Sequence, residues 1–450
     1  MSAQNDTIAA IATASGRGGI GIIRISGPKT KNICTALLGE LIPARQARLK
    51  SFKREDGNTI DSGLALFFQS PASYTGEDTL ELQGHGGPIV LDMVLERVLS
   101  LGARLAEPGE FTQRAFLNNK LDLAQAEAVA DIIDAGTSSA AMSAQRSLQG
   151  AFSSAINDLQ KQLTHLRLYV ESAIDFSDED IDFLAGEELK KIISNLQNAF
   201  KKITDTAKQG SLLRDGMTVV LAGKPNAGKS SLLNALAQNE TAIVTDVAGT
   251  TRDVLKEQIQ IDGMPVHIID TAGLRETTDL IELEGVKRAR NAIANADVVL
   301  LMVDDRDAST NEHLSLLNEI PKHIPTTLVF NKIDLTGKES IVDESGQQTT
   351  IRLSAKKEQG ISLLTEHLKT LMGFKPEEKN IFLARRRHLD ALARAQDFLN
   401  TGIEQLLTYQ AGELFAEDLR LAQQALSEIT GKMTPDDLLG EIFSSFCIGK

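Results

Sequence analysis

A glycine-rich segment at residues 223–230 has the residue types and spacing of a phosphate-binding loop. It reads GKPNAGKS, fits the pattern GxxxxGK[ST], and lies between an apolar stretch ending at Leu221 and a helix-like stretch opening at Ser231. Backbone N–H groups of such a loop close on phosphate oxygens, Lys229 would neutralise the β- and γ-phosphates, and the Ser230 hydroxyl would bind Mg²⁺. The segment predicts a nucleoside triphosphate site.

Two later segments predict that the base is guanine. Residues 331–334 read NKID at the end of an apolar stretch and resemble the NKxD element of GTPases. A carboxylate such as Asp334 accepts hydrogen bonds from guanine N1–H and from its exocyclic amine, which adenine cannot supply in this arrangement. Residues 354–356, Ser-Ala-Lys, resemble the loop that backs the base.

A third segment, Asp270-Thr-Ala-Gly273, fits the switch that senses the γ-phosphate. Asp270 would hold Mg²⁺ through water, and Gly273 would offer its N–H to the γ-phosphate. The usual glutamine after this switch is replaced by Leu274 and Arg275, so another group must act on the attacking water. Glu282 is one candidate, and its alternative interpretation is a solvated charge in an acidic stretch.

The segment between the loop and this switch predicts further metal ligands. Thr251 is the threonine expected to close on Mg²⁺, and oxygens of Asn226 and of residues 245–250 could bind a monovalent cation. For Asn226 the alternative is a side chain that only stabilises the loop. The residues expected to bind GTP are Asn226, Ala227, Gly228, Lys229, Ser230, Ser231, Thr245, Asp246, Val247, Ala248, Gly249, Thr250, Thr251, Asp270, Thr271, Ala272, Gly273, Asn331, Lys332, Asp334, Ser354, Ala355 and Lys356.

The elements that must position these residues follow from changes in hydrophobic spacing. Residues 1–119 alternate strand-like and helix-like stretches. Leu148 to Val170 has apolar residues three and four apart, as expected of one long helix, and this spacing returns from Phe382 to Leu406. We therefore expect an α/β P-loop GTPase domain (216–373) inserted into an α-helical bundle (120–215 and 374–450), after an N-terminal α+β domain (1–119).

Composition narrows the cellular setting. The chain has 450 residues, 47 Lys and Arg against 61 Asp and Glu, and a net charge of −14, which disfavours a protein that binds nucleic acid through a basic surface. The longest apolar run has six residues (298–303), too few for a membrane span. Two cysteines, Cys34 and Cys447, predict a reducing cytoplasm, and Cys447 is either a reactive thiol or a small hydrophobic anchor.

Several segments together resemble the MnmE (TrmE) family of tRNA-modifying GTPases. Within the nucleotide-binding segment they are the phosphate loop, GTTRD (249–253) and DTAG (270–273). Outside it they include residues 16–27, which begin GRGG and end at Gly27, YTGEDTLELQGHGG (74–87) and PGEF (108–111). RAFL (114–117) with the residues up to Ala130, and the end FCIGK (446–450), match as well. The resemblance covers nearly the whole chain.

This resemblance implies a homodimer that works with an FAD-dependent partner of the MnmG (GidA) family in a heterotetramer. Together they would place a carboxymethylaminomethyl-type group on carbon 5 of the tRNA wobble uridine, using a folate one-carbon unit such as 5-formyltetrahydrofolate and K⁺-stimulated GTP hydrolysis. It also implies that tRNA is delivered largely by the partner. The implied roles are folate binding by Arg24, Glu81, Lys120 and Lys450, K⁺ binding by Asn226, Thr245, Val247 and Thr250, Mg²⁺ binding by Ser230 and Thr251, and orientation of water by Glu282.

Two other functions remain open at this point. A regulatory GTPase of ribosome assembly would have the same core, although the chain has no basic RNA-binding module that we recognise. A membrane-associated nucleotide switch would have only Arg385-Arg386-Arg387-His388 in its favour, which is more simply a solvated helix face.

Overall fold

A computed structural model describes residues 6–175, 186–239, 256–270, 290–310, 312–375, 381–432, 436–444, 446–447 and 449. The chain divides into two compact units, each made of several stretches of sequence. One contains residues 1–130, 148–196 and 391–450, and the other contains 131–147 and 197–390. The domain limits expected from the sequence remain a prediction, because each of these units combines parts of more than one expected domain.

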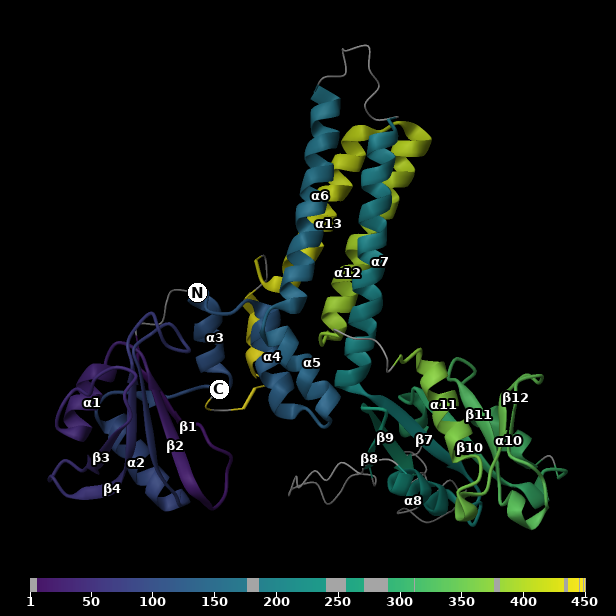
Figure 1. The fold of residues 1–450 in the computed structure, drawn as a ribbon, viewed down its shortest axis with the longest axis horizontal. Helices are drawn as coiled ribbons and strands as arrows, with labels where there is room; N and C mark the ends of the chain where they lie inside the picture. The colour runs from purple at the N-terminus through teal and green to yellow at the C-terminus, as the bar shows by residue number, and fades with distance from the viewer. Residues whose placement is uncertain are drawn as a thin grey trace. The chain divides into compact units, whose positions relative to one another are not determined.

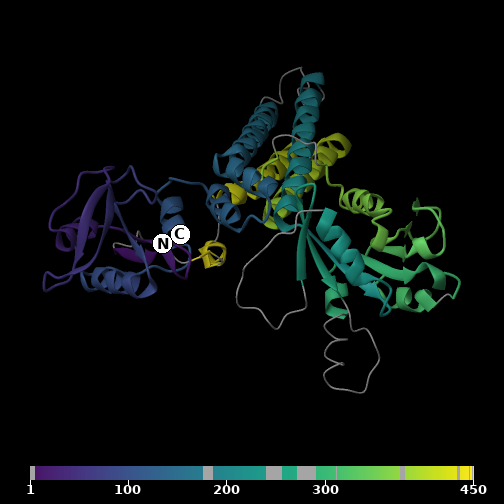
Figure 2. The same cartoon turned by 60° about the horizontal axis from the view of Figure 1, so that its bottom comes forward.

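The first unit contains a six-stranded sheet with the order β3-β4-β5-β2-β1-β6. Alternate apolar residues such as Ile23, Phe67 and Leu82 point to one face, where side chains of α1 and α2 pack against them. Figures 1 and 2 show these two helices beside the sheet. The elements are β1 (Ile8–Ile11), β2 (Gly18–Ser26), α1 (Thr30–Leu38), β3 (Arg48–Lys53), β4 (Thr59–Phe68), β5 (Thr79–Gly86), α2 (Pro88–Ser100), β6 (Arg104–Leu105) and α3 (Glu110–Leu117).

Helices from both sides of the nucleotide-binding segment pack together in the same unit. Helix α6 (Ala151–Asp175) lies beside α13 (Gly412–Thr430) in Figure 1. The Gln160 amide donates to Ser427 Oγ at 2.9 Å, and the Gln423 amide donates to Thr164 Oγ1 at 2.7 Å. This pairing confirms that the helical stretches before and after the α/β segment form one bundle. Of the other helices, α14 (Asp436–Ser444) and most of α4 (Leu123–Asp134) and α12 (Arg386–Tyr409) belong to this unit. Helix α7 (Glu187–Asp215) is divided between the two units, and nearly all of α5 (Ser138–Leu148) belongs to the second.

The end of the chain returns to its beginning. Phe443 and Phe446 are buried against Leu123 and Phe116. Gly449 lies close against Ala12, since a Cβ added to this glycine would stand only 3.0 Å from Ala12 Cα. Both ends of the sequence therefore help to build the first unit.

The second unit contains a seven-stranded sheet with the order β12-β13-β11-β10-β7-β9-β8, in which the five strands β13, β11, β10, β7 and β9 run parallel. Val219 and Leu221 face α8 and α11, whereas Val220 and Leu301 face α10, so helices cover both faces of the sheet. The elements are β7 (Met217–Gly223), α8 (Lys229–Asn239), β8 (Lys256–Ile261), β9 (Met264–Asp270), β10 (Val298–Asp304), α10 (Glu312–Glu319), β11 (Thr326–Asn331), β12 (Ile341–Asp343), β13 (Thr350–Arg352) and α11 (Ile361–Met372).

These layers confirm the expected fold class, an α/β P-loop unit within a helical bundle after an N-terminal α+β domain. Two details of the helix prediction are wrong. Leu148 ends α5, because Gly150 has φ +89 and interrupts the helix before α6 begins. Phe382 lies before the start of α12, although it is buried. No helix within the described ranges is long and apolar enough to cross a membrane.

Candidate nucleotide-binding site

The residues with predicted chemistry follow the carboxyl ends of neighbouring parallel strands. In the register of the sheet, Gly223 pairs with Met302 and Asn331 pairs with Asp304. The loops that follow β7, β10, β11 and β13 therefore begin at one edge of the sheet. In open α/β sheets this edge is where ligands bind.

The phosphate loop joins β7 directly to α8. The loop turns between Lys224 and Ala227, whose N–H donates to the Lys224 carbonyl at 3.2 Å, and α8 begins at Lys229. Lys229 is only 8% exposed, and its Nζ donates to the carbonyl of Gly223 at 2.9 Å. The ammonium group therefore lies over the loop backbone, where a bound triphosphate would attract it. Ser230 and Ser231 are exposed at the start of the helix.

The NKID segment (331–334), which the sequence predicts to recognise guanine, holds the phosphate loop through two consecutive side chains. Asn331 Nδ2 donates to the Ala227 carbonyl at 3.0 Å, and Lys332 Nζ donates to the Asn226 carbonyl at 2.6 Å. Asn331 is 2% exposed and also accepts from the Ala355 N–H at 3.0 Å. One short segment thus fixes the phosphate loop on one side and the Ser-Ala-Lys loop on the other.

The proposed base-recognition residues meet each other directly. Ser354, which is fully buried, donates its hydroxyl to Asp334 Oδ1 at 2.6 Å. Asp334 and Lys356 are themselves exposed. This arrangement leaves the Asp334 carboxylate open to a ligand while one of its oxygens is held by the neighbouring loop.

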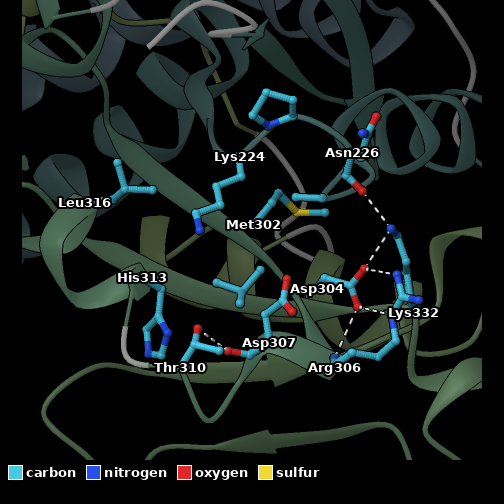
Figure 3. A pocket seen from close by; sticks show the side chains of 13 residues that line it. Lys224, Asn226, Met302, Asp304, Arg306, Asp307, Thr310, His313, Leu316 and Lys332 are labelled. Atoms are coloured by element: carbon cyan, nitrogen blue, oxygen red, sulfur yellow. Dashed lines mark hydrogen bonds and ion pairs between the residues drawn. The ribbon is translucent and has the colours of Figure 1, made fainter. Parts of the chain in front are cut away.

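Asp304, at the end of β10, is a second anchor for the same segment. Its Oδ2 accepts from Lys332 Nζ at 2.8 Å and from Arg306 Nη2 at 2.7 Å, as the dashed lines in Figure 3 show. The hydrogen bonds from Arg306 and Lys332 hold the pKa of Asp304 well below its ordinary value, although burial opposes this shift. Asp304 is therefore a charged acceptor that fixes Lys332 against the loop.

A cavity of about 210 Å³ lies beside this cluster (Figure 3). Its walls come from residues 224–227 of the phosphate loop, from the turn that follows β10, and from α10. Lys229, Ser230 and Asp334 are not among the described residues that line it. The cavity therefore shares Asn226, Ala227 and Lys332 with the predicted GTP-binding set, but not the residues predicted to contact the phosphates, Mg²⁺ and the base edge.

Part of the predicted site falls outside the described residues. These predicted residues are Thr245, Asp246, Val247, Ala248, Gly249, Thr250, Thr251, Thr271, Ala272, Gly273, Glu282 and Lys450. Asp270 ends β9, beside Leu221 in the sheet register, which places its backbone next to the end of β7. Of the predicted GTP-binding set, the structure thus brings together the phosphate loop, the NKID segment and the Ser-Ala-Lys loop.

The residues predicted to bind folate lie in the first unit. Arg24 and Glu81 are cross-strand neighbours on β2 and β5, and Arg24 Nε donates to Glu81 Oε1 at 3.0 Å. The Arg24 guanidinium also lies 5.5 Å from the Tyr74 ring centre and 5.7 Å from that of Phe111. Lys120 instead donates to the Pro71 carbonyl at 3.1 Å and is exposed.

The two cysteines have different surroundings. Cys34 is buried in α1, and burial raises the pKa of its thiol. Cys447 is exposed, and its neighbour Phe446 is the buried residue that anchors the tail. The exposed position does not fit the alternative in which Cys447 is a small hydrophobic anchor.

Sequence reasoning missed Asp304, Asp305 and Arg306. A signal was available, because the polar run Asp304-Asp305-Arg306-Asp307 follows the six apolar residues of β10 at once. A polar run at that point of a parallel sheet lies at the ligand-binding edge. Its partners could not be identified, since they depend on the register of β10 against β11.

Comparisons with known proteins agree with this architecture. The family model described as GTP-binding protein TrmE N-terminus matches residues 7–120, and the model of the MnmE helical domain matches residues 123–447. The tRNA modification GTPase MnmE of Hydrogenovibrio crunogenus is 57% identical over 446 residues, which cover 99% of each chain. That of Proteus mirabilis is 56% identical over 450 residues, again with 99% of each chain covered.

Among solved structures, the G-domain of FeoB from Methanococcus jannaschii is 27% identical to this chain. The match covers 35% of this chain and 98% of that domain, with a TM-score of 0.27. The two family models together cover nearly all of the sequence, and the relatives match it from end to end. The chain therefore belongs to the MnmE family of tRNA modification GTPases.

Proposed function

We propose that this chain binds and hydrolyses GTP at the carboxyl edge of the seven-stranded sheet, and that hydrolysis serves the modification of the wobble uridine of tRNA. One observation carries the proposal. Asn331 and Lys332 hold consecutive carbonyls of the phosphate loop, while Asp334 stands beside Ser354, so one segment links the positions for phosphate and base. The tRNA substrate is inferred from membership of the MnmE family of tRNA modification GTPases.

Mg²⁺ would be held by the hydroxyls of Ser230 and Thr251 and would neutralise charge on the β- and γ-phosphates. Ser230 fits this role, because its side chain is exposed at the first turn of α8, directly after the phosphate loop. Asp270 would support the ion through water. Lys229 would leave the loop carbonyls it now contacts and bind the phosphates, which exchanges neutral acceptors for charged ones.

K⁺ would be held by oxygens of Asn226, Thr245, Val247 and Thr250 and would supply positive charge near the phosphates. Asn226 fits a monovalent cation, because it offers a neutral amide oxygen on an exposed turn where φ is +66. Glu282 would orient the attacking water, since Leu274 and Arg275 stand where a glutamine is usual.

A folate such as 5-formyltetrahydrofolate would bind near Arg24, Glu81, Lys120 and Lys450. The donor set fits such a ligand, because Glu81 can accept from a pterin N–H edge and cations can bind carboxylates. The Arg24 and Glu81 side chains are 23% and 17% exposed, so a ligand can reach this pair and exchange its own groups for their mutual contact. The aromatic rings of Tyr74 and Phe111 beside Arg24 add apolar surface for a planar ligand.

The reaction would add an aminomethyl-type group, carboxymethylaminomethyl in one form, to carbon 5 of the wobble uridine. The chain would act as a homodimer with an FAD-dependent protein of the MnmG (GidA) family, in the cytoplasm, and the partner would deliver most of the tRNA contact. A net charge of −14 supports that division of labour, because this chain lacks the positive charge for strong phosphate binding.

The proposal is tested by mass spectrometry of tRNA nucleosides from cells that lack this gene. Wild type should restore the hypermodified wobble uridine, and Asp270→Ala should not. Asp297→Ala is the matched control, because this exposed carboxylate precedes β10 at the opposite edge of the same sheet and should restore the nucleoside. An unchanged nucleoside profile in the deletion strain would refute the proposal and favour a regulatory GTPase of ribosome assembly.

A further inference from the structure

Asp305 is a fully buried carboxylate that the proposed hydrolysis does not use. Its side chain is 0% exposed and accepts from Thr336 Oγ1 at 2.6 Å and from Lys338 Nζ at 2.9 Å. Arg352 lies further away, with Nε 3.7 Å from Oδ1. A carboxylate loses much hydration free energy on burial, so its position needs these partners.

Both partners that donate hydrogen bonds to Asp305 belong to the turn that carries Asp334. This turn runs from Lys332 to Lys338 and contains a short 3₁₀ helix, Ile333–Leu335. Within it the Gly337 N–H donates to the Ile333 carbonyl at 2.8 Å. We call residues 332–338 the guanine turn.

The two ends of the guanine turn are held by two consecutive carboxylates. Lys332, at its start, contacts Asp304 at 2.8 Å, and Thr336 and Lys338, at its end, contact Asp305. The sheet explains this pairing, because Asp304 is in register with Asn331, the residue before the turn. The sheet therefore fixes the backbone of Asp304, and with it the adjacent Asp305, beside the turn that their side chains hold.

We propose that Asp304 and Asp305 are positioning residues that set the place of Asp334 and thereby the selectivity for guanine. They act through Lys332, Thr336 and Lys338 and do not contact the base. The inference rests on the proposed function, in which Asp334 reads guanine.

The physical reason is the geometry of a two-point contact. Guanine offers Asp334 two donors, N1–H and the exocyclic amine, whereas hypoxanthine offers only N1–H. A carboxylate that moves can keep one hydrogen bond by rotating, but it loses the second, because hydrogen bonds weaken steeply with poor angles. Loosening the turn should therefore weaken GTP binding more than ITP binding.

The test compares dissociation constants for GTP and ITP, measured by calorimetry on the full chain. Thr336→Val removes only the hydroxyl that reaches Asp305, and Thr336→Ser keeps it. We expect Thr336→Val to weaken GTP binding by about 10-fold, the usual scale for a hydrogen bond to a charged group, and to leave ITP binding nearly unchanged. Thr336→Ser should retain the wild-type ratio of the two constants.

Asp305→Asn and Lys338→Met extend the series. Both should lower the GTP-to-ITP selectivity, with Asp305→Asn giving the larger loss, because it weakens both anchors at once. The matched control is Asp131→Asn, another buried carboxylate of the same unit, which pairs with Arg214 and Arg385. The control should leave the selectivity as in wild type, even where it lowers stability.

Failure of the inference and of the proposed function can be told apart. Asp334→Asn should shift the preference from GTP to XTP. A normal GTP preference in Asp334→Asn would overturn the guanine motif itself. A shift to XTP in that variant, together with unchanged GTP-to-ITP selectivity in Thr336→Val, Lys338→Met and Asp305→Asn, would overturn only the positioning role.

Discussion

At the scale of single residues, Gly228 shows why the phosphate loop needs a glycine beside the guanine motif. Its φ is +98, a conformation that other residues rarely adopt. A Cβ at this position would overlap Asn331 Nδ2, the donor that holds the Ala227 carbonyl. The glycine therefore allows Asn331 to reach the loop.

We expect Gly228→Ala to break this contact and to weaken GTP binding. The lost hydrogen bond and the left-handed backbone together should cost about 2–4 kcal/mol, which is roughly 30-fold or more in the dissociation constant. Calorimetry with GTP would measure the loss. The control is Gly373→Ala, because Gly373 also has positive φ and open space where a Cβ would stand, and it lies at the end of α11, outside the guanine turn. Equal loss in both variants would mean that backbone strain alone is responsible.

These single residues also show which parts of the site could be predicted from the sequence. Lys229, Asp334 and Ser354 were predicted from short motifs, since the chemistry of such motifs depends on neighbours along the chain. The contacts of Asn331 with Ala227, and of Lys332 with Asn226 and Asp304, were not predicted. They join segments about 30 to 100 residues apart, and only the strand register brings these together.

At the scale of elements, the start of α4 follows its sequence closely. The Gln125 N–H donates to Asp122 Oδ1 at 2.9 Å, and Gln125 Oε1 accepts from the Asp122 N–H at 3.0 Å. This reciprocal pair is a capping box, which an Asp followed three residues later by a Gln indicates in a sequence. Prediction from apolar spacing failed at Gly150, because the periodic apolar residues continue through a position whose backbone is not helical.

Removing the cap should destabilise the helix that it begins. Asp122→Ala leaves N–H groups at the helix start without an acceptor and should lower the free energy of unfolding by about 1 kcal/mol. Chemical denaturation followed by circular dichroism would measure this. Asp158→Ala is the control, because Asp158 is 62% exposed on α6 and, among the residues that the structure describes, pairs only with Lys161, so little change is expected. A similar loss in both variants would argue against the cap.

At the scale of the whole molecule, residues far apart in the sequence are tied by a buried ionic cluster in the first unit. Arg114, whose side chain is 6% exposed, contacts Asp6 at 2.7 Å, Glu77 at 3.2 Å and Glu110 at 2.8 Å. Arg104 also contacts Glu110, at 2.6 Å. The cluster joins β6, α3, the start of the chain and the loop before β5. The sequence predicted an alternation of strands and helices in residues 1–119, but neither β6 and α3 themselves nor which charges would meet.

The cluster predicts a dependence of stability on pH. Burial alone would raise the pKa of Glu110, but hydrogen bonds from Arg104, the Glu107 N–H and Arg114 outweigh it and lower the pKa. A carboxyl with a lowered pKa stabilises the fold above its unfolded-state pKa of 4.5, and this contribution disappears as the pH falls below that value. The free energy of unfolding should therefore decrease between pH 5 and pH 3.

Glu110→Gln should remove part of this acid sensitivity. At pH 7 it should lower the free energy of unfolding by about 2 kcal/mol, because it removes the buried carboxylate that Arg104 and Arg114 share, while Asp6 and Glu77 remain as their other charge partners. Urea denaturation at pH 7 and pH 4 would measure both effects. Glu417→Gln is the control, because its carboxyl pairs with Arg420 at an exposed site. An unaltered pH slope in Glu110→Gln would assign the acid sensitivity to other groups.

The return of the tail to the N-terminal domain affects how the chain can fold during its synthesis. Phe116 and Leu123 leave the ribosome well before Phe443 and Phe446, which cover them. Some 300 residues separate the two groups, and at about 5–20 residues per second roughly 15 to 60 seconds pass before they can meet. During that interval the apolar surface that awaits the tail faces the solvent, and the nascent chain needs a chaperone or rapid completion to avoid aggregation there.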